Sequence, residues 1–408
     1  MKILHLSTED EFGGASKAAY RLHQGLKKIG VESWMLVKNK STDDPNIIGG
    51  RGEIWKVYSF LEKQIDKIPT RLHFKNKNIP FSNGFVSSQD VIKRIKRINP
   101  EIIHIHWINN GFISITQLKK IFELGRPIVI TLHDSWFFTG GCHIPQSCEK
   151  YRKWCGNCPL LGSSKEDDLS RLNWKRKERV YKNNSITIVA PSKWMQSCVK
   201  QSSLLKDKNI SCIPNAIDVD IFKPLDKEIL REKWKLDKNK KYLLFGAVNA
   251  LTDPNKGFYL LKKALQDIKI LNCELIVFGS NKEKHIDVSI PCINLGYINN
   301  QEDLVEIYSI ADVFVGPSLQ ESFGQTLLEA MSCGTPCVAF DNSGPGDFIT
   351  HKKDGYLAKP FETEDLVRGI EFCLWTKGLG TSSRNKVINN YSIKSIAQEY
   401  LNLYQSLQ

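Results

Sequence analysis

Apolar positions along this chain follow two repeats that alternate with each other. Short apolar runs, of the length expected for buried parallel strands, occur at residues 2–7, 33–37, 101–107, 127–134, 186–190, 242–246, 273–279, 293–296, 312–316 and 337–340. Segments with apolar residues three and four positions apart, the helical repeat, occur at 15–29, 90–98, 256–265, 301–310, 324–331, 364–374 and 393–407. Strands that alternate with helices predict an α/β protein with parallel sheets. Residues 42–83 are mixed and charged, and we assign no element there.

The length and the composition indicate two globular domains. At 408 residues the chain is too long for one ordinary hydrophobic core, and its 41% hydrophobic and 25% charged residues are typical of a globular protein in water. The first apolar run is interrupted by His5 and followed by Glu9, which is not the pattern of a secretion signal. No stretch reaches the roughly 18 apolar residues that a membrane-spanning helix needs. We therefore expect a cytoplasmic or peripheral protein.

The most informative stretch runs from Asp312 to Phe340. It predicts a strand, a loop, a helix that opens at Gly324, and a second strand. The first amides of this helix lack intrahelical partners and carry the positive end of the helix dipole, which favours an anion. These amides belong to Phe323, Gly324, Gln325 and Thr326. Glu321 precedes the helix and Glu329 returns to nearly the same face, where carboxylates can accept hydrogen bonds from hydroxyls. A ligand with both a diphosphate and sugar hydroxyls, a nucleotide-sugar, fits this combination.

Two interpretations of the glutamate pair are open from the residues alone. In one, Glu321 caps the helix and Glu329 faces solvent; in the other, both hold a ligand. The run Glu321, Ser322, Phe323, Gly324, then Leu328, Glu329, Ala330, Met331, followed by Cys333, Gly334, Thr335 and Pro336, resembles the E-x7-E signature of retaining glycosyltransferases of family four. This resemblance favours the ligand interpretation.

The resemblance covers nearly the whole chain and implies its architecture. It implies an α/β GT-B fold, in which two Rossmann-like domains face each other across a cleft. The run from Ile210 to Asp218 resembles the passage between these domains. The implied parts are an acceptor-side domain at 1–214 with a Cys-rich loop at 140–160, a nucleotide-sugar-binding domain at 215–385, and a final helix at 386–408 that crosses back to the first domain.

The resemblance also implies roles for single residues. Lys256 matches the lysine that binds the donor diphosphate, and His133, at the end of a predicted strand, matches the histidine that faces the transferred sugar. The implied catalytic residues are Glu321, His133 and Lys256, and the implied donor-binding residues are Lys256, Glu321, Ser322, Phe323, Gly324, Gln325, Thr326 and Glu329. Gly13 and Gly14 match a glycine pair near the donor phosphates and the acceptor, and a tight turn is the equally open alternative. Ala247 stands where many relatives carry an arginine, so one of two expected cations is missing.

Four cysteines gather in one predicted loop, namely Cys142, Cys148, Cys155 and Cys158. Four thiolates that end in a C-x2-C pair fit a tetrahedral structural zinc site, although the first pair is spaced more widely than usual. Disulfides are disfavoured in a reducing cytosol. The equally open alternative is a set of buried thiols that holds a long loop by packing.

The formal charge of +13 suits anionic partners. Basic segments at 90–98 and 172–182, the second with Trp174 and Tyr181 among its cations, suit a lipid surface, and a solvated helix face is the simpler interpretation of each. His104 and His106 flank a predicted strand, and we expect structural roles for them. Zinc-dependent nucleic-acid binding is a further hypothesis, but no sequence-reading motif supports it, so we expect no nucleic-acid partner.

The residues and the resemblance together imply a metal-independent, retaining hexosyltransferase. Its donor would be a UDP- or GDP-sugar, and its acceptor a glycan or lipid-linked molecule of bacterial surface polysaccharide synthesis, reached in the cytoplasm or peripherally at the inner membrane face. No D-x-D metal motif ends a predicted strand, so we expect no cofactor for catalysis. Ala247 supports the alternative, a non-catalytic nucleotide-sugar or glycan-binding protein of the same fold.

Overall fold

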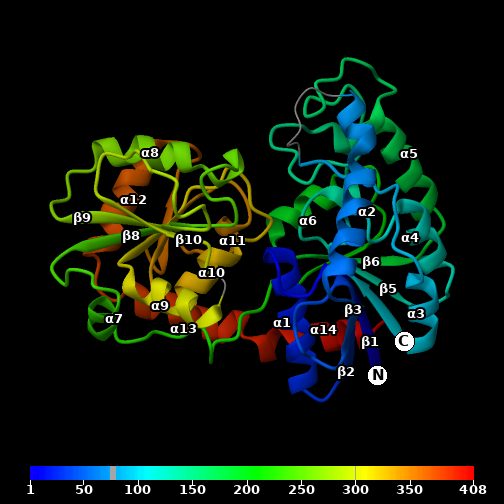
Figure 1. Ribbon diagram of the computed structural model, residues 1–408, viewed down its shortest axis with the longest axis horizontal. Coiled ribbons are helices and arrows are strands. Elements are labelled where there is room, and N and C mark those ends of the chain that lie inside the picture. Colours follow the sequence, from blue (N-terminus) through cyan, green and yellow to red (C-terminus); the bar gives the residue numbers. More distant parts are fainter. Residues whose placement is uncertain (74–79, 299) are drawn as a thin grey trace. The chain divides into compact units, whose positions relative to one another are not determined.

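The computed structural model describes residues 1–73, 80–298 and 300–408, with only the backbone of 72 and 73. Residues 74–79, part of the stretch without a predicted element, lie outside this description. The chain forms two compact units (Figure 1): unit 1 is Met1–Pro214 with Ile396–Gln408, and unit 2 is Asn215–Ser395. The first segment of unit 1 ends at Pro214, and unit 2 begins at Asn215. The returning segment starts at Ile396 instead of 386, because α13 (Leu379–Tyr391) is held in unit 2, where Arg384 donates to the carbonyl of Phe222 at 2.6 Å.

Unit 1 is built on a seven-stranded parallel sheet in the order β3-β2-β1-β4-β5-β6-β7. Its strands are β1 (Lys2–Glu9), β2 (Glu32–Asn39), β3 (Ile47–Gly50), β4 (Ile102–Ile105), β5 (Ile128–Thr131), β6 (Ile186–Ala190) and β7 (Asn209–Cys212). Its helical segments are α1 (Gly14–Lys28), α2 (Glu53–His73), α3 (Val91–Ile98), α4 (Ile115–Phe122), η1 (Trp136–Phe138), η2 (Lys150–Arg152), α5 (Leu169–Tyr181), α6 (Lys193–Lys200) and most of α14 (Ile393–Gln405). The strand order reverses between β1 and β4, the place where ligands bind in such sheets.

Unit 2 repeats this plan with a six-stranded parallel sheet in the order β10-β9-β8-β11-β12-β13. Its strands are β8 (Lys241–Gly246), β9 (Cys273–Phe278), β10 (Cys292–Gly296), β11 (Val313–Gly316), β12 (Cys337–Phe340) and β13 (Gly355–Ala358). Its helical segments besides α13 are α7 (Lys227–Lys233), η3 (Pro254–Lys256), α8 (Phe258–Asp267), α9 (Gln301–Ile310), α10 (Gln325–Ser332), α11 (Pro345–Phe348) and α12 (Thr363–Trp375). Here the order reverses between β8 and β11, which brings the loops after both strands to one edge.

Both sheets are covered on two faces, which explains the continuous apolar runs of the central strands. Leu244 on β8 pairs with Phe314 on β11, and both are fully or almost fully buried. In unit 1 the last helix adds polar contacts to the core. The hydroxyl of Tyr404 lies 2.7 Å from Nδ1 of His104, and that of Tyr400 lies 2.9 Å from the hydroxyl of Thr131. The segment after Ile396 is therefore part of the interior of unit 1.

Two basic helices do not offer the lipid-facing surface considered from the sequence. Val91 and Ile95 of α3 are buried in the core of unit 1, so the apolar side of that helix is occupied. Trp174 and Tyr181 of α5 are buried as well. Lys177 of α5 is also inside, where its ammonium lies 3.6 Å from the centre of the Trp136 ring. Burial of the apolar residues agrees with the solvated-face interpretation of the two helices, but Lys177 is an exception because it is buried.

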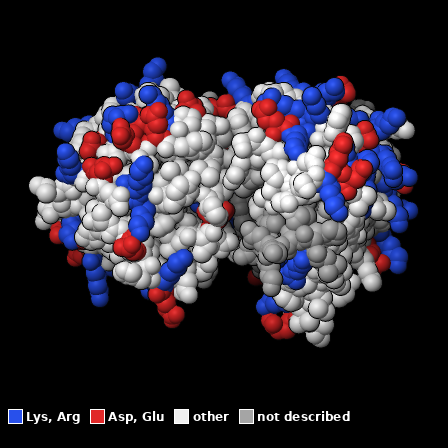
Figure 2. All heavy atoms as spheres, turned by 90° about the horizontal axis from the view of Figure 1, so that it is seen from above, with Lys and Arg blue, Asp and Glu red and all other residues white. Residues whose placement is uncertain are grey.

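Charged side chains are spread widely over the protein. Figure 2 shows Lys and Arg over both units on the face drawn, interspersed with Asp and Glu. None of the described helices combines the length and the apolar composition needed to cross a lipid bilayer.

Candidate functional site

Lys256 and Glu321 meet at the edge of the unit 2 sheet where its strand order reverses. Lys256 ends η3, in the loop after β8, and Glu321 lies in the loop after β11, the neighbouring strand. The ammonium of Lys256 lies 2.7 Å from Oε1 of Glu321, and the two side chains are 22% and 23% exposed. Burial opposes the charge on Lys256, but the adjacent carboxylate outweighs burial and raises the pKa of the lysine. Lys256 is therefore a cation at neutral pH.

Backbone contacts hold the two loops together. The side-chain amide of Asn255 donates to the carbonyl of Gln320 at 2.8 Å, and the backbone N–H of Leu319 donates to the carbonyl of Asn255 at 2.7 Å. Gly257 has a φ of +70°, and a Cβ there would lie 1.8 Å from the carbonyl oxygen of Pro317. Only glycine fits, and it separates Lys256 from α8. The predicted helix from 256 is wrong in this detail, because Lys256 belongs to a short 3-10 turn and α8 begins at Phe258.

The amino end of α10 lies in the same loop region. Gly324 precedes the helix with a φ of +110° and provides no side-chain cap. The side chain of Gln325 is more telling: both its amide nitrogen and its amide oxygen are buried and have no hydrogen-bond partner within the described part of the chain. A buried amide without partners is costly, so the missing bonds are expected from a water molecule or a ligand.

The other predicted donor residues differ in their surroundings. Ser322 and Thr326 are half-buried at the start of α10, whereas the ring of Phe323 is buried 5.0 Å from that of Phe348. Glu329 is only 2% exposed, and the hydroxyl of Tyr308 donates to its Oε2 at 2.9 Å. Its contact with ribose hydroxyls stays a prediction, and the capping alternative with Glu329 in solvent does not describe this buried carboxylate.

Unit 1 carries the remaining predicted site residues. Gly13 precedes α1 with a φ of +87°, and no described atom lies within 4 Å of a Cβ built on it or on Gly14. His133 follows β5, and its Nε2 lies 3.0 Å from Nδ1 of His106. Burial lowers the pKa of His133 to about 4, although Asp134 opposes that effect. His133 is therefore a neutral imidazole at physiological pH, able to exchange hydrogen bonds with hydroxyls.

Buried histidines continue inward from His133. The other ring nitrogen of His106, Nε2, lies 2.9 Å from Nδ1 of His5 on β1. Among the described residues, only His5, His104 and His106 bring three metal-ligand atoms within 4.8 Å of one another. Both ring nitrogens of His104 already face hydroxyls, those of Tyr404 and Thr131. We therefore interpret the cluster as a hydrogen-bonded core, which agrees with the structural roles expected for His104 and His106.

The four cysteines of the 140–160 loop are free thiols. The backbone N–H of Gly140 donates to Sγ of Cys155 at 3.0 Å, and burial raises the pKa of this thiol to about 12. No three of the four sulfurs reach the 4.8 Å spacing seen in the histidine cluster. The zinc hypothesis thus requires the sulfurs to draw closer together, and it stays a prediction beside the packing hypothesis.

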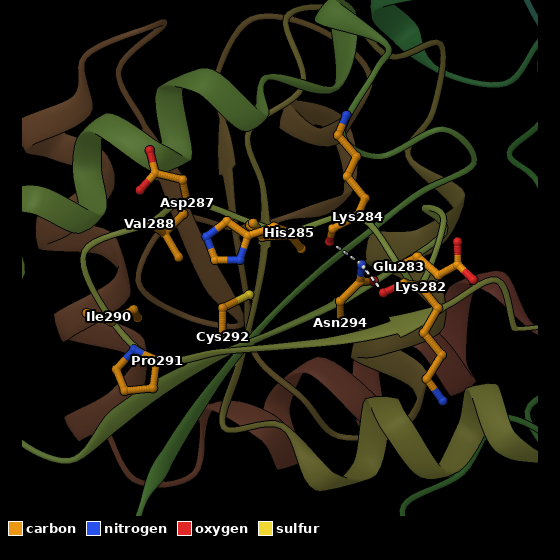
Figure 3. Close-up of a pocket in the computed structure, with 11 residues that line it drawn as sticks. Lys282, Glu283, Lys284, His285, Asp287, Val288, Ile290, Pro291, Cys292 and Asn294 are labelled. Carbon is orange, nitrogen blue, oxygen red and sulfur yellow. Dashed lines mark hydrogen bonds between the residues drawn. The ribbon is translucent and has the colours of Figure 1, made fainter.

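A separate hollow, with a cavity volume of about 500 Å³, is lined by the segment that connects β9 to β10 and by the first half of β10 (Figure 3). Lys282, His285, Asp287 and Asn294 are among its lining residues, and the amide of Asn294 donates to the carbonyl of Lys284 at 3.1 Å. Its lining includes neither Lys256 nor any residue of the 321–329 run. The sequence analysis did not identify this hollow, since its residues form no recognisable motif.

Two family profiles match consecutive parts of this chain, and a relative matches nearly all of it. The family profile described as Glycosyltransferase Family 4 matches residues 12–221, and the profile described as Glycosyl transferases group 1 matches residues 226–392. A UDP-Gal:alpha-D-GlcNAc-diphosphoundecaprenol alpha-1,3-galactosyltransferase of Escherichia coli is 26% identical over 402 residues, 94% of each chain.

Solved structures show the same architecture. A sucrose-phosphate synthase of Thermosynechococcus elongatus has a TM-score of 0.69 at 17% identity, over 100% of this chain and 99% of that one. Anabaena HepE in complex with UDP and glucose has a TM-score of 0.67 at 16% identity, over 100% of both chains. With the two parallel α/β units, these likenesses confirm the predicted GT-B fold.

Proposed function

Because this chain belongs to glycosyltransferase family 4, we propose that it is a retaining enzyme that transfers a sugar from a nucleotide-sugar to a glycan or lipid-linked acceptor of bacterial surface polysaccharide synthesis. The observation that carries the proposal is the Lys256–Glu321 pair beside the amino end of α10, with the unpartnered amide of Gln325. A cation, free amides and a carboxylate match a diphosphate that is attached to sugars.

Unit 2 holds the donor in this proposal. Departure of the nucleoside diphosphate develops negative charge, and the Lys256 ammonium with the first amides of α10 stabilises that charge electrostatically. These groups supply the positive charge themselves, so we propose transfer without a metal ion. Glu321 then accepts hydrogen bonds from the hydroxyls of the transferred sugar, and Glu329 from those of the ribose. The departing phosphate takes the proton of the acceptor hydroxyl, and the anomeric configuration is retained.

Unit 1 serves the acceptor side. His133 is a neutral imidazole in a histidine network, so it can bond a sugar hydroxyl without bringing a positive charge near the anomeric carbon. The open space around Gly13 and Gly14 leaves their backbone accessible to a phosphate or an acceptor. HepE was solved with UDP and glucose, and the Escherichia coli relative is named for UDP-galactose and a diphosphoundecaprenol acceptor. These names support a UDP-sugar donor and a lipid-linked acceptor, met in the cytoplasm at the inner membrane face.

The second candidate is a nucleotide-sugar or glycan-binding protein without activity. It is favoured by Ala247, which leaves Lys256 as the single cation of the predicted donor set. The two candidates share a ligand and differ in turnover.

A panel of UDP- and GDP-sugars tests the proposal in two steps. A thermal-shift screen identifies the donor, since a ligand at a hundred times its dissociation constant stabilises the fold by about 2.7 kcal/mol. Release of the nucleoside diphosphate is then measured with and without EDTA, and NMR of the product shows the anomeric configuration. Binding without release, with every acceptor class supplied, would identify the non-catalytic protein. Loss of release in EDTA would refute metal independence.

A further inference from the structure

Helix α2 contacts unit 1 through its polar side. Ser59, Glu62, Asp66 and Thr70 recur every three or four residues, so they share one face, and each is 3–9% exposed. A surface helix normally buries an apolar stripe and presents polar residues to water. In α2 this arrangement is inverted.

Buried charges fix the helix in this orientation. The ammonium of Lys38 lies 2.9 Å from Oε2 of Glu62, with both side chains almost fully buried. Asp66 accepts the backbone N–H groups of Phe85 and Val86 at 2.8 and 3.1 Å. Rotation of α2 about its own axis would leave Lys38 buried without its counter-ion, which would lower the free energy of unfolding by several kcal/mol. The inverted orientation is therefore a stable property of unit 1.

The outer side of α2 carries an apolar stripe. The stripe consists of Ile54, Val57, Tyr58, Leu61, Ile65 and Ile68. These positions fall within an arc of about 100° at 3.6 residues per turn. Ile54 is 89% exposed, and Leu61 and Ile65 are about half exposed, at 51% and 52%. In Figure 1, α2 runs along the outside of unit 1. A continuous exposed stripe of this length marks a contact surface.

Cations line one flank of the apolar stripe. Lys56, Lys63, Lys67 and Arg71 project between the stripe and the buried polar face. Burial lowers the pKa of Lys67, and the nearby charges of Lys63 and Arg71 lower it further, while Asp66 opposes them. Lys56 pairs with the exposed Glu53 at 2.6 Å, whereas the other two acids of the described helix, Glu62 and Asp66, are buried. An anionic partner would relieve the repulsion of Lys67 by Lys63 and Arg71.

We propose that the apolar stripe of α2 lies in the surface layer of an anionic lipid bilayer, with the flanking cations at the head groups. A helix with cations beside a broad apolar face binds in the plane of such an interface. The inference builds on the inner-membrane location proposed above and does not depend on the sugar-transfer chemistry. A lipid-linked acceptor is held in a bilayer, so this contact brings the enzyme to its substrate.

Vesicle flotation of the full chain tests the proposal. We expect the protein to float with vesicles of phosphatidylcholine and phosphatidylglycerol and far less with phosphatidylcholine alone. Combining Leu61→Gln, Ile65→Gln and Ile68→Gln removes apolar area while keeping good helix formers, and should raise the lipid concentration for half-binding at least about tenfold. Lys63→Gln with Lys67→Gln should weaken binding to anionic vesicles by about fivefold or more for each charge.

Matched variants control for general loss of apolar area or charge. The combination Ile229→Gln, Leu271→Gln and Ile388→Gln removes exposed apolar residues of unit 2, and Lys119→Gln with Lys120→Gln removes two exposed cations of α4. Both should float like the wild type, and circular dichroism should show all variants folded. Equal flotation of the stripe variant and the wild type would overturn the proposal, as would a lipid-free dimer that the stripe substitutions dissociate. Lys256→Ala should float with vesicles like the wild type. Loss of sugar transfer in this variant is therefore distinguished from loss of membrane binding.

Discussion

Removing the ammonium of Lys256 separates its role in transfer from its role in stability. In the structure, Lys256 forms one ion pair, at 2.7 Å to Glu321, with each side chain somewhat under a quarter exposed. An exposed pair contributes under about 1 kcal/mol, while breaking a buried one costs about 3–5 kcal/mol. We therefore expect Lys256→Ala to lower the free energy of unfolding by about 1–2 kcal/mol. Loss of one preorganised donor to a developing oxyanion costs about 3 kcal/mol in the transition state, so kcat should fall by a factor of about 100–1000.

The assay is release of the nucleoside diphosphate at saturating donor, alongside urea unfolding of the same preparations. Lys233→Ala is the control, because Lys233 forms an ion pair of similar length in unit 2, at 2.6 Å to Glu306 between α7 and α9, with a lysine that is more exposed than Lys256. It should change kcat less than about twofold and the free energy of unfolding by under about 1 kcal/mol. If Lys256→Ala retained kcat within about threefold of the wild type, the assignment of the diphosphate to this cation would be refuted.

Three further predictions concern other parts of the chain. Gln325→Leu removes a buried amide without partners, so the free energy of unfolding should stay equal or rise. Calorimetry should show about tenfold weaker nucleotide-sugar binding. Unchanged affinity would contradict the ligand role of Gln325. Because burial lowers the pKa of His133 to about 4, the unfolded chain binds that proton first as the pH falls, and stability should decline by up to about 3 kcal/mol between roughly pH 6.5 and 4. His133→Asn should flatten this decline in urea titrations, and an unaltered slope would count against it. If the loop thiols bind zinc, elemental analysis should find about one zinc per chain. Cys158→Ser should then lose the zinc and have a lower Tm than the wild type. A wild-type protein without zinc would support the packing hypothesis.

The alternation of strands and helices was predictable, because the apolar residues of buried strands and of core-facing helices recur in simple patterns. Residues 301–310 were predicted as a helix and are α9 with the same bounds. From local sequence, His133 was placed at the end of a strand, Lys256 at the start of the helix after a strand and loop, and Glu321 in the loop before a helix. Parallel strands bring such loops to one edge, so the meeting of Lys256 with Glu321, 65 residues apart, followed from the topology.

Features that depend on distant partners were not predictable. Helix α2 was missed although its apolar residues recur every three or four positions, because charged residues are mixed among them. Its orientation, with the apolar side outward, depends on the contact of Glu62 with Lys38 on β2, which no local pattern reveals. Glu329 was expected at the ligand, but its contact with Tyr308 depends on how α9 packs against α10. The link from His133 to His106 requires β4 beside β5, an adjacency that no local pattern reveals.

The segment from Ile396 onward gives unit 1 a particular order of assembly. During translation, β1 to β7 leave the ribosome before all of unit 2, but Tyr400 and Tyr404 follow only after it. Until then, Thr131 and His104 in the nascent first unit lack the tyrosine hydroxyls that they contact in the finished fold. A chain released early would keep these polar groups exposed in an open core, where chaperones and proteases act on incomplete products.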